Sequence, residues 1–116
     1  SALRQSIHNV LDNALEASPH WVRLAVHREE ETLLVSVTDR GPGFPQAMLD
    51  NLGRPYQSSK GRPGSGLGLF LVMNVLRTLG GNLKASNLAQ GGALVTLSLP
   101  LSVVTLEQET GGTNGV

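Results

Sequence analysis

The stretch GRPGSGLGLFL, residues 61–71, places four glycines within eight positions and then becomes apolar. Glycine weakens the interior of a helix but is favoured where the backbone must bend or approach a ligand closely. A glycine-rich turn that opens a helix presents free N–H groups and the positive end of the helix dipole, and both favour an anion. The stretch therefore predicts either an anion-binding turn or a plain linker followed by a helix.

Two common phosphate-binding motifs do not fit this stretch. A Walker A loop would require Lys and then Ser or Thr after Gly66, where the chain has Leu67 and Gly68. A dinucleotide-binding G-x-G-x-x-G turn would require a preceding strand and a third glycine one position later than Gly68. If the turn binds phosphate, other parts of the chain must therefore supply the metal ligand and the contact to the base.

The composition indicates one domain with an aliphatic core. The chain has 116 residues, of which 40% are hydrophobic and only 3% aromatic, and a domain typically has about 100–200 residues. The net charge of zero argues against nucleic acid as a partner. Without Cys there is no disulfide, cysteine nucleophile or Cys-ligated zinc. The first residues run directly into a helical pattern, so we expect a piece of a longer protein.

Hydrophobic periodicity predicts two long helices and four strands. The helices are expected over residues 3–18 and 67–79, and the strands over 21–27, 32–39, 82–88 and 93–99. Because strands in hairpins alternate with helices, we predict an α+β fold. Its architecture would be a two-layer α/β sandwich, with a mixed, mostly antiparallel sheet covered on one face by helices.

Turn residues divide these elements. The charged run 28–31 predicts a hairpin loop, and Gly80 with Gly81 predicts the end of the second long helix. A short helix is expected around residues 45–52. We assign residues 1–100 to the domain, with a loop or lid over about 53–66. The remaining tail, 101–116, is rich in polar residues and glycine and is expected to be disordered.

Asp39 ends a predicted strand on the side that faces the core, by alternation with the apolar residues before it. A carboxylate there is unfavourable without a hydrogen-bond partner, and the exocyclic amine of a ligand would be a suitable donor. Gly41 and Gly43 follow at once and would let a ligand approach the backbone. The same D-x-G-x-G pattern is also typical of an ordinary turn.

Asn9 and Asn13 are four residues apart on the first predicted helix, at the edge of its apolar stripe. Asn is unfavourable inside a helix because its side chain competes for backbone hydrogen bonds. Two of them in register indicate a polar role, such as giving oxygen ligands to Mg²⁺. The alternative is a half-exposed polar shoulder.

Taken in order, these motifs resemble the ATP-binding domain of sensor histidine kinases, in the GHKL or Bergerat-fold superfamily. NVLDNALEAS is similar to the N box, DRGPGF to the G1 box and GSGLGLFLV to the G2 box. RPYQSSK resembles a variant F box and GGALVTLSLP the closing strand. The resemblance covers roughly residues 3–100. Its lid is also similar to that of redox-responding kinases of the RegB/PrrB type.

The resemblance implies an ATP site between the helices and the sheet. Asp39 would accept a hydrogen bond from the adenine amine, and Gly41 and Gly43 would admit the ring. Asn13 would ligate Mg²⁺, while Asn9 and Lys60 would be catalytic residues near the phosphates. The residues implied to contact the triphosphate are Lys60, Arg62, Gly64, Gly66, Leu67 and Gly68.

The resemblance also implies a kinase rather than a hydrolase. Relatives that hydrolyse ATP, such as DNA gyrase and MutL, place a Glu as general base where this chain has Asn9. An amide cannot activate water, so the γ-phosphate would be kept for a histidine acceptor. None of His8, His20 and His27 lies in a phosphoacceptor motif. The acceptor would therefore lie on a separate dimerisation domain, and a response regulator would receive the phosphate.

By the same resemblance, the full-length protein would be a homodimer and this chain alone a monomer. It would be the cytoplasmic domain of a bacterial inner-membrane sensor protein. Two alternatives stay open. One is another GHKL protein kinase, such as an anti-sigma-factor serine kinase or a kinase of the mitochondrial dehydrogenase type. The other is a degenerate module that binds a protein and no nucleotide, against which Asp39, Asn13 and the glycines argue.

Overall fold

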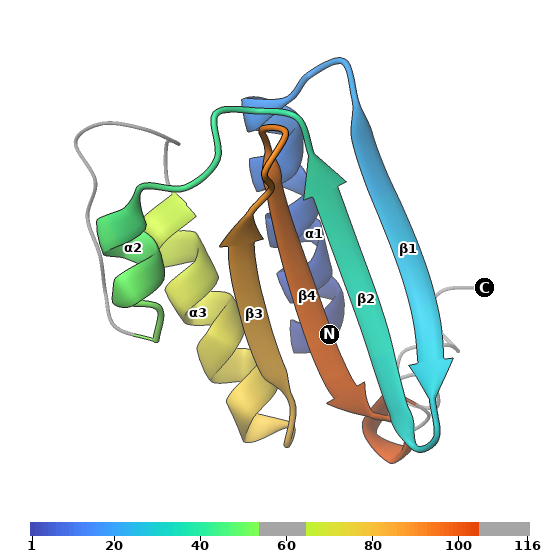
Figure 1. Cartoon of the computed structure of the whole chain (residues 1–116). Helices are drawn as coiled ribbons and strands as arrows, with labels where there is room; N and C mark the ends of the chain where they lie inside the picture. The colour runs from blue at the N-terminus through green and yellow to red at the C-terminus, as the bar shows by residue number, and fades with distance from the viewer. Residues whose placement is uncertain (54–64, 105–116) are drawn as a thin grey trace.

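The structure, a computed structural model, describes residues 1–53 and 65–104. Within these residues, strands in the order β1-β2-β4-β3 form one sheet, and every pairing is antiparallel. The predicted α+β sandwich is confirmed, although this part of the sheet is antiparallel rather than mixed (Figure 1). The elements are α1 (Ala2–Ala17), β1 (Val22–Glu29), β2 (Thr32–Asp39), α2 (Gln46–Asp50), α3 (Ser65–Thr78), β3 (Asn82–Asn87) and β4 (Ala93–Pro100).

Helices α1 and α3 lie on one face of the sheet, and none of the described helices covers the other face (Figure 1). Helix α1 packs against β2 and α3, while α3 also packs against β3 and β4. Because side chains alternate along a strand, every second residue of β2 and β4 enters the aliphatic core. In the described part of the chain, the largest fully buried side chains are Val10, Val37, Leu69, Val72, Leu76, Leu97 and Leu99.

Strand β1 is an edge strand that the helices leave partly uncovered. Its register pairs Leu24 with Val37 and Val26 with Val35, which places these residues on the helix side, as alternation predicts. Leu24 and Val26 are nevertheless 48% and 62% exposed. Alternation therefore predicts the face of a residue correctly but not its burial, which depends on where the helices lie.

The predicted hairpin loop over 28–31 is wrong in its first half. Arg28 and Glu29 belong to β1, and Glu29 pairs with Thr32 across a two-residue connection. Such short connections require positive φ, and Glu30 has φ 54°. The Arg28 Nε donates to the Glu30 carbonyl at 2.9 Å. The side chain of this β1 residue therefore stabilises the turn that follows the strand.

Helix α3 begins at Ser65, two residues before the predicted start. Gly66, Leu67 and Gly68 therefore lie in its first turn rather than ahead of it. The predicted end is confirmed, because Gly80 has φ 84° and the Gly81 N–H donates to the Leu76 carbonyl at 2.7 Å.

The start of the predicted tail is ordered. Residues 101–104 form a helical turn, the Leu101 N–H donates to the Glu31 carbonyl at 2.7 Å, and Val104 packs against the core. The expectation of disorder is therefore wrong for these four residues, and 105–116 lie outside the described part. None of the helices in the described part has the length and apolar character that crossing a bilayer requires.

Candidate nucleotide-binding site

Asp39 is the buried carboxylate that alternation predicts. It ends β2 on the helix side and is only 2% exposed. Its Oδ1 accepts a hydrogen bond from the Gly41 N–H at 2.9 Å. This bond turns the chain sharply after the strand, so the side chain directs the path of the G1 loop. Its predicted contact with the adenine base stays a prediction.

Gly41 and Gly43 have reasons within the protein itself to lack side chains. A Cβ atom at Gly41 would lie 2.6 Å from the Ala17 carbonyl oxygen and 2.8 Å from the Ala17 Cβ. Gly43 has φ 82°, and a Cβ there would lie 2.8 Å from the Asn87 Oδ1. Close packing against α1 and β3 therefore requires both glycines, in addition to the ligand approach for which the sequence singled them out.

One strip of α1 meets both glycine motifs. Asn13 and Ala17 are four residues apart, so they lie about one turn, roughly 6 Å, from each other along the helix. The Asn13 Nδ2 lies 3.3 Å from the position that a Cβ would occupy at Gly68, and Ala17 contacts Gly41. Asn9 lies one turn earlier and accepts from the Gln5 Nε2 at 3.4 Å. The structure thus brings the N, G1 and G2 boxes together.

The first turn of α3 faces this strip. The N–H groups of a helix's first turn have no acceptor within the helix, so the backbone of Gly66, Leu67 and Gly68 provides donors for an anion. The other predicted phosphate contacts, Lys60, Arg62 and Gly64, lie outside the described residues. Their roles stay predictions, as does the ligand-binding role of every site residue.

Three further residues hold the site together and were missed in the sequence. The buried Ser18 hydroxyl donates to the Trp21 carbonyl and accepts from the Arg40 N–H at 3.2 Å. Asn87 binds the backbone of Phe44. A Cβ at Gly92 would collide with the Asp39 carbonyl. The only local signals are a strand-end Asn, a residue before Pro and a Gly-Gly turn, which are too common to identify a site.

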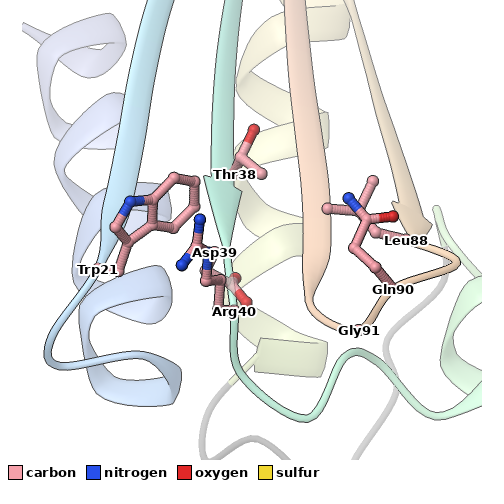
Figure 2. Close-up of a pocket in the computed structure, with 7 residues that line it drawn as sticks. All are labelled: Trp21, Thr38, Asp39, Arg40, Leu88, Gln90 and Gly91. Carbon is pink, nitrogen blue, oxygen red and sulfur yellow. The ribbon is translucent and has the colours of Figure 1, made fainter.

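A hollow of about 380 Å³ lies on the face of the sheet opposite to the helices (Figure 2). On one side of it the Arg40 guanidinium carbon lies 4.2 Å from the centre of the Trp21 ring. Figure 2 shows this pair in front of the sheet, opposite Leu88 and Gln90, with the helices behind. The hollow is lined by Trp21, Thr38, Asp39, Arg40, Leu88, Gln90 and Gly91.

Comparison with known proteins defines the class. Residues 1–103 match the family of histidine kinase-, DNA gyrase B-, and HSP90-like ATPases, and the chain belongs to this family. The predicted membership of the GHKL superfamily is thus confirmed. The members of this family are ATP-binding domains, which supports the prediction that the chain binds ATP.

The individual relatives narrow the class to sensor histidine kinases. The chain is 37% identical over 108 residues to the signal transduction histidine-protein kinase AfsQ2 of Streptomyces coelicolor, covering 90% of this chain and 20% of that protein. The structure of the mycobacterial sensor histidine kinase MprB is 32% identical with a TM-score of 0.68, covering 85% of this chain and 70% of that one. Full-length ShkA in complex with AMPPNP is 25% identical with a TM-score of 0.71, covering 85% and 21%.

These comparisons confirm the resemblance to the catalytic domain of histidine kinases. The chain spans about a fifth of the length of the curated relatives it matches. The narrower similarity to the RegB/PrrB type stays a prediction.

Proposed function

We propose that this chain binds Mg-ATP between its helices and the end of β2 and donates the γ-phosphate to a histidine on a separate domain. The observation that carries the proposal is the strip of α1 on which Asn13 meets Gly68 and Ala17 meets Gly41. The two glycine motifs thus meet α1 about one helical turn apart, and this proximity supports a single ligand that spans both. The AMPPNP complex of ShkA supports a nucleotide ligand in this fold.

Each end of the nucleotide has a matching group. The Asp39 carboxylate accepts a hydrogen bond from the exocyclic amine of adenine, and the loop after it borders the ring. The first turn of α3 donates backbone N–H groups to the phosphates. Lys60 and Arg62 add positive charge from the lid, and Asn9 lies beside the phosphates on α1.

Asn13 fits the predicted magnesium ion. An amide oxygen is a hard ligand that Mg²⁺ accepts, and Asn13 is partly exposed beside the first turn of α3. In the described residues, no three His, Asp or Glu side chains are grouped to hold a metal. When bound, the ion would offset the charge of the phosphates.

Asn13→Ala is expected to lower the affinity for Mg-ATP about tenfold and to leave Mg-free ADP binding within about twofold, because the substitution removes the amide oxygen that would ligate the ion. Calorimetric titrations with Mg²⁺ and with EDTA measure the two affinities. Asn74→Ala, at an exposed position of α3, is the matched control. An equal loss with and without Mg²⁺ would show that Asn13 is not a metal ligand.

The chain alone is expected to retain no stable label when incubated with γ-labelled ATP. The reason is that the acceptor histidine lies on another domain, so this chain has no group that keeps the γ-phosphate. Water does not take the phosphate readily either, because Asn9 cannot act as the base. Acid-labile phosphate is measured on the wild-type chain after gel separation. Label that accumulates stably on His8, His20 or His27 would contradict this assignment.

The remaining parts of the proposal concern the whole protein. We place the acceptor histidine on a dimerisation domain of the same polypeptide, in a homodimer, with the present chain monomeric by itself. A response regulator takes the phosphate onto an aspartate. The protein is a bacterial sensor with this domain on the cytoplasmic side of the inner membrane. The names of the relatives favour this reading over a serine kinase.

A further inference from the structure

Asn87 forms a two-point contact with one residue of the G1 loop. Its Oδ1 accepts from the Phe44 N–H at 2.7 Å, and its Nδ2 donates to the Phe44 carbonyl at 2.9 Å. The two residues are 43 positions apart. A single side chain thus satisfies both backbone groups of Phe44, as a neighbouring strand would.

The contact lies at the far end of the loop that begins at Asp39. At the near end, the Gly41 N–H donates to the Asp39 Oδ1 and the Arg40 N–H donates to the Ser18 hydroxyl. The Asn87 Oδ1 also closes the space beside Gly43. Since Asn87 itself is exposed, its contribution to the loop comes from these hydrogen bonds and not from hydrophobic packing.

We infer that Asn87 is a positioning residue for nucleotide binding. It acts through Phe44, and it sets the path of the Gly41–Gly43 backbone against which the adenine ring lies. This inference rests on the proposed function. A loop that is ordered before binding loses less conformational entropy when the ligand arrives, so releasing Phe44 weakens binding without removing any group that touches the nucleotide.

The test compares Asn87→Ala with Asn82→Ala. Asn82 is the same residue type, is also exposed and lies at the opposite end of β3. Asn87→Ala is expected to weaken ADP binding about fivefold to tenfold and to speed amide exchange at Gly43 and Phe44. Asn82→Ala is expected to change ADP affinity less than about twofold. Calorimetry gives the affinities, and thermal melting shows that both variants are folded.

A double-mutant cycle separates action through the loop from a general loss of stability. Gly43→Ala introduces a Cβ against the Asn87 Oδ1 and also strains a positive φ. In the Asn87→Ala background only the strain remains, so Gly43→Ala should weaken ADP binding at least about threefold less than in the wild type. Additive effects of the two substitutions would contradict a role exerted at Gly43.

The outcomes distinguish this inference from the function on which it rests. Saturable ADP binding by the wild type together with unchanged affinity in Asn87→Ala overturns the inference and leaves the proposed function standing. Absence of saturable binding by the wild type overturns both.

Discussion

Asp39→Asn is expected to lower the affinity for ADP by at least roughly 100-fold, about 2.7 kcal/mol, while the chain remains folded. The substitution keeps the shape of the side chain and the oxygen that accepts from the Gly41 N–H. It replaces the other oxygen with an NH₂ group, which is itself a donor and cannot accept from the adenine amine. The lost hydrogen bond lies in a buried environment, where an unpaired donor is costly.

The measurement is a calorimetric titration of the wild type and of Asp39→Asn. Asp50→Asn is the control, because it makes the same chemical change at an exposed position of α2. It should bind ADP as the wild type does. Wild-type affinity in Asp39→Asn would remove Asp39 from the base-binding site.

Gly92→Ala is expected to reduce the free energy of unfolding by about 3 kcal/mol. Gly92 has φ 94°, and an added Cβ would collide with the carbonyl of Asp39. Two backbone segments would then have to separate, since neither the hairpin nor the end of β2 has a flexible side chain at the contact. The same shift displaces Asp39, so ADP binding should weaken as well.

Gly91→Ala provides the matched control for this substitution. Gly91 has φ 101°, but nothing lies within 4 Å of the position that its Cβ would take. It should therefore show only the cost of a positive φ, about 1 kcal/mol. Urea denaturation measures both variants, and the difference reports the collision with Asp39. Equal destabilisation by the two substitutions would show that the hairpin does not press on Asp39.

Local sequence patterns were sufficient to predict the helices and strands that have one apolar and one polar face. The apolar stripe of α3 and the alternation in β2 and β4 predicted their burial correctly, and the same alternation placed Asp39 on the helix side. The pattern failed where burial depends on distant elements. Leu24 and Val26 alternate in the same way as the buried residues of β2 and β4, but they lie on an edge strand that the helices leave partly uncovered.

The candidate site shows the same division. Asp39, Asn13 and the glycines stand in recognisable motifs, because each motif is a short run of residues. The contacts that hold those motifs together join distant positions, such as Asn87 with Phe44 and Ser18 with Arg40, which are 43 and 22 residues apart. Side chains of common types at common turn positions give no sign of such partners. The packing of Gly41 against Ala17 likewise could not be predicted from the sequence, because it depends on how α1 lies against the loop.

The central claim is that an adenine nucleotide lies between the G1 loop and the first turn of α3. Backbone amide NMR shifts of the wild-type chain during an ADP titration test it most directly. The account predicts saturable shifts in two separate segments, Asp39–Phe44 and Ser65–Gly68, with one common dissociation constant. Shifts confined to the opposite hollow around Trp21 and Gln90, or no saturable shifts at all, would contradict it.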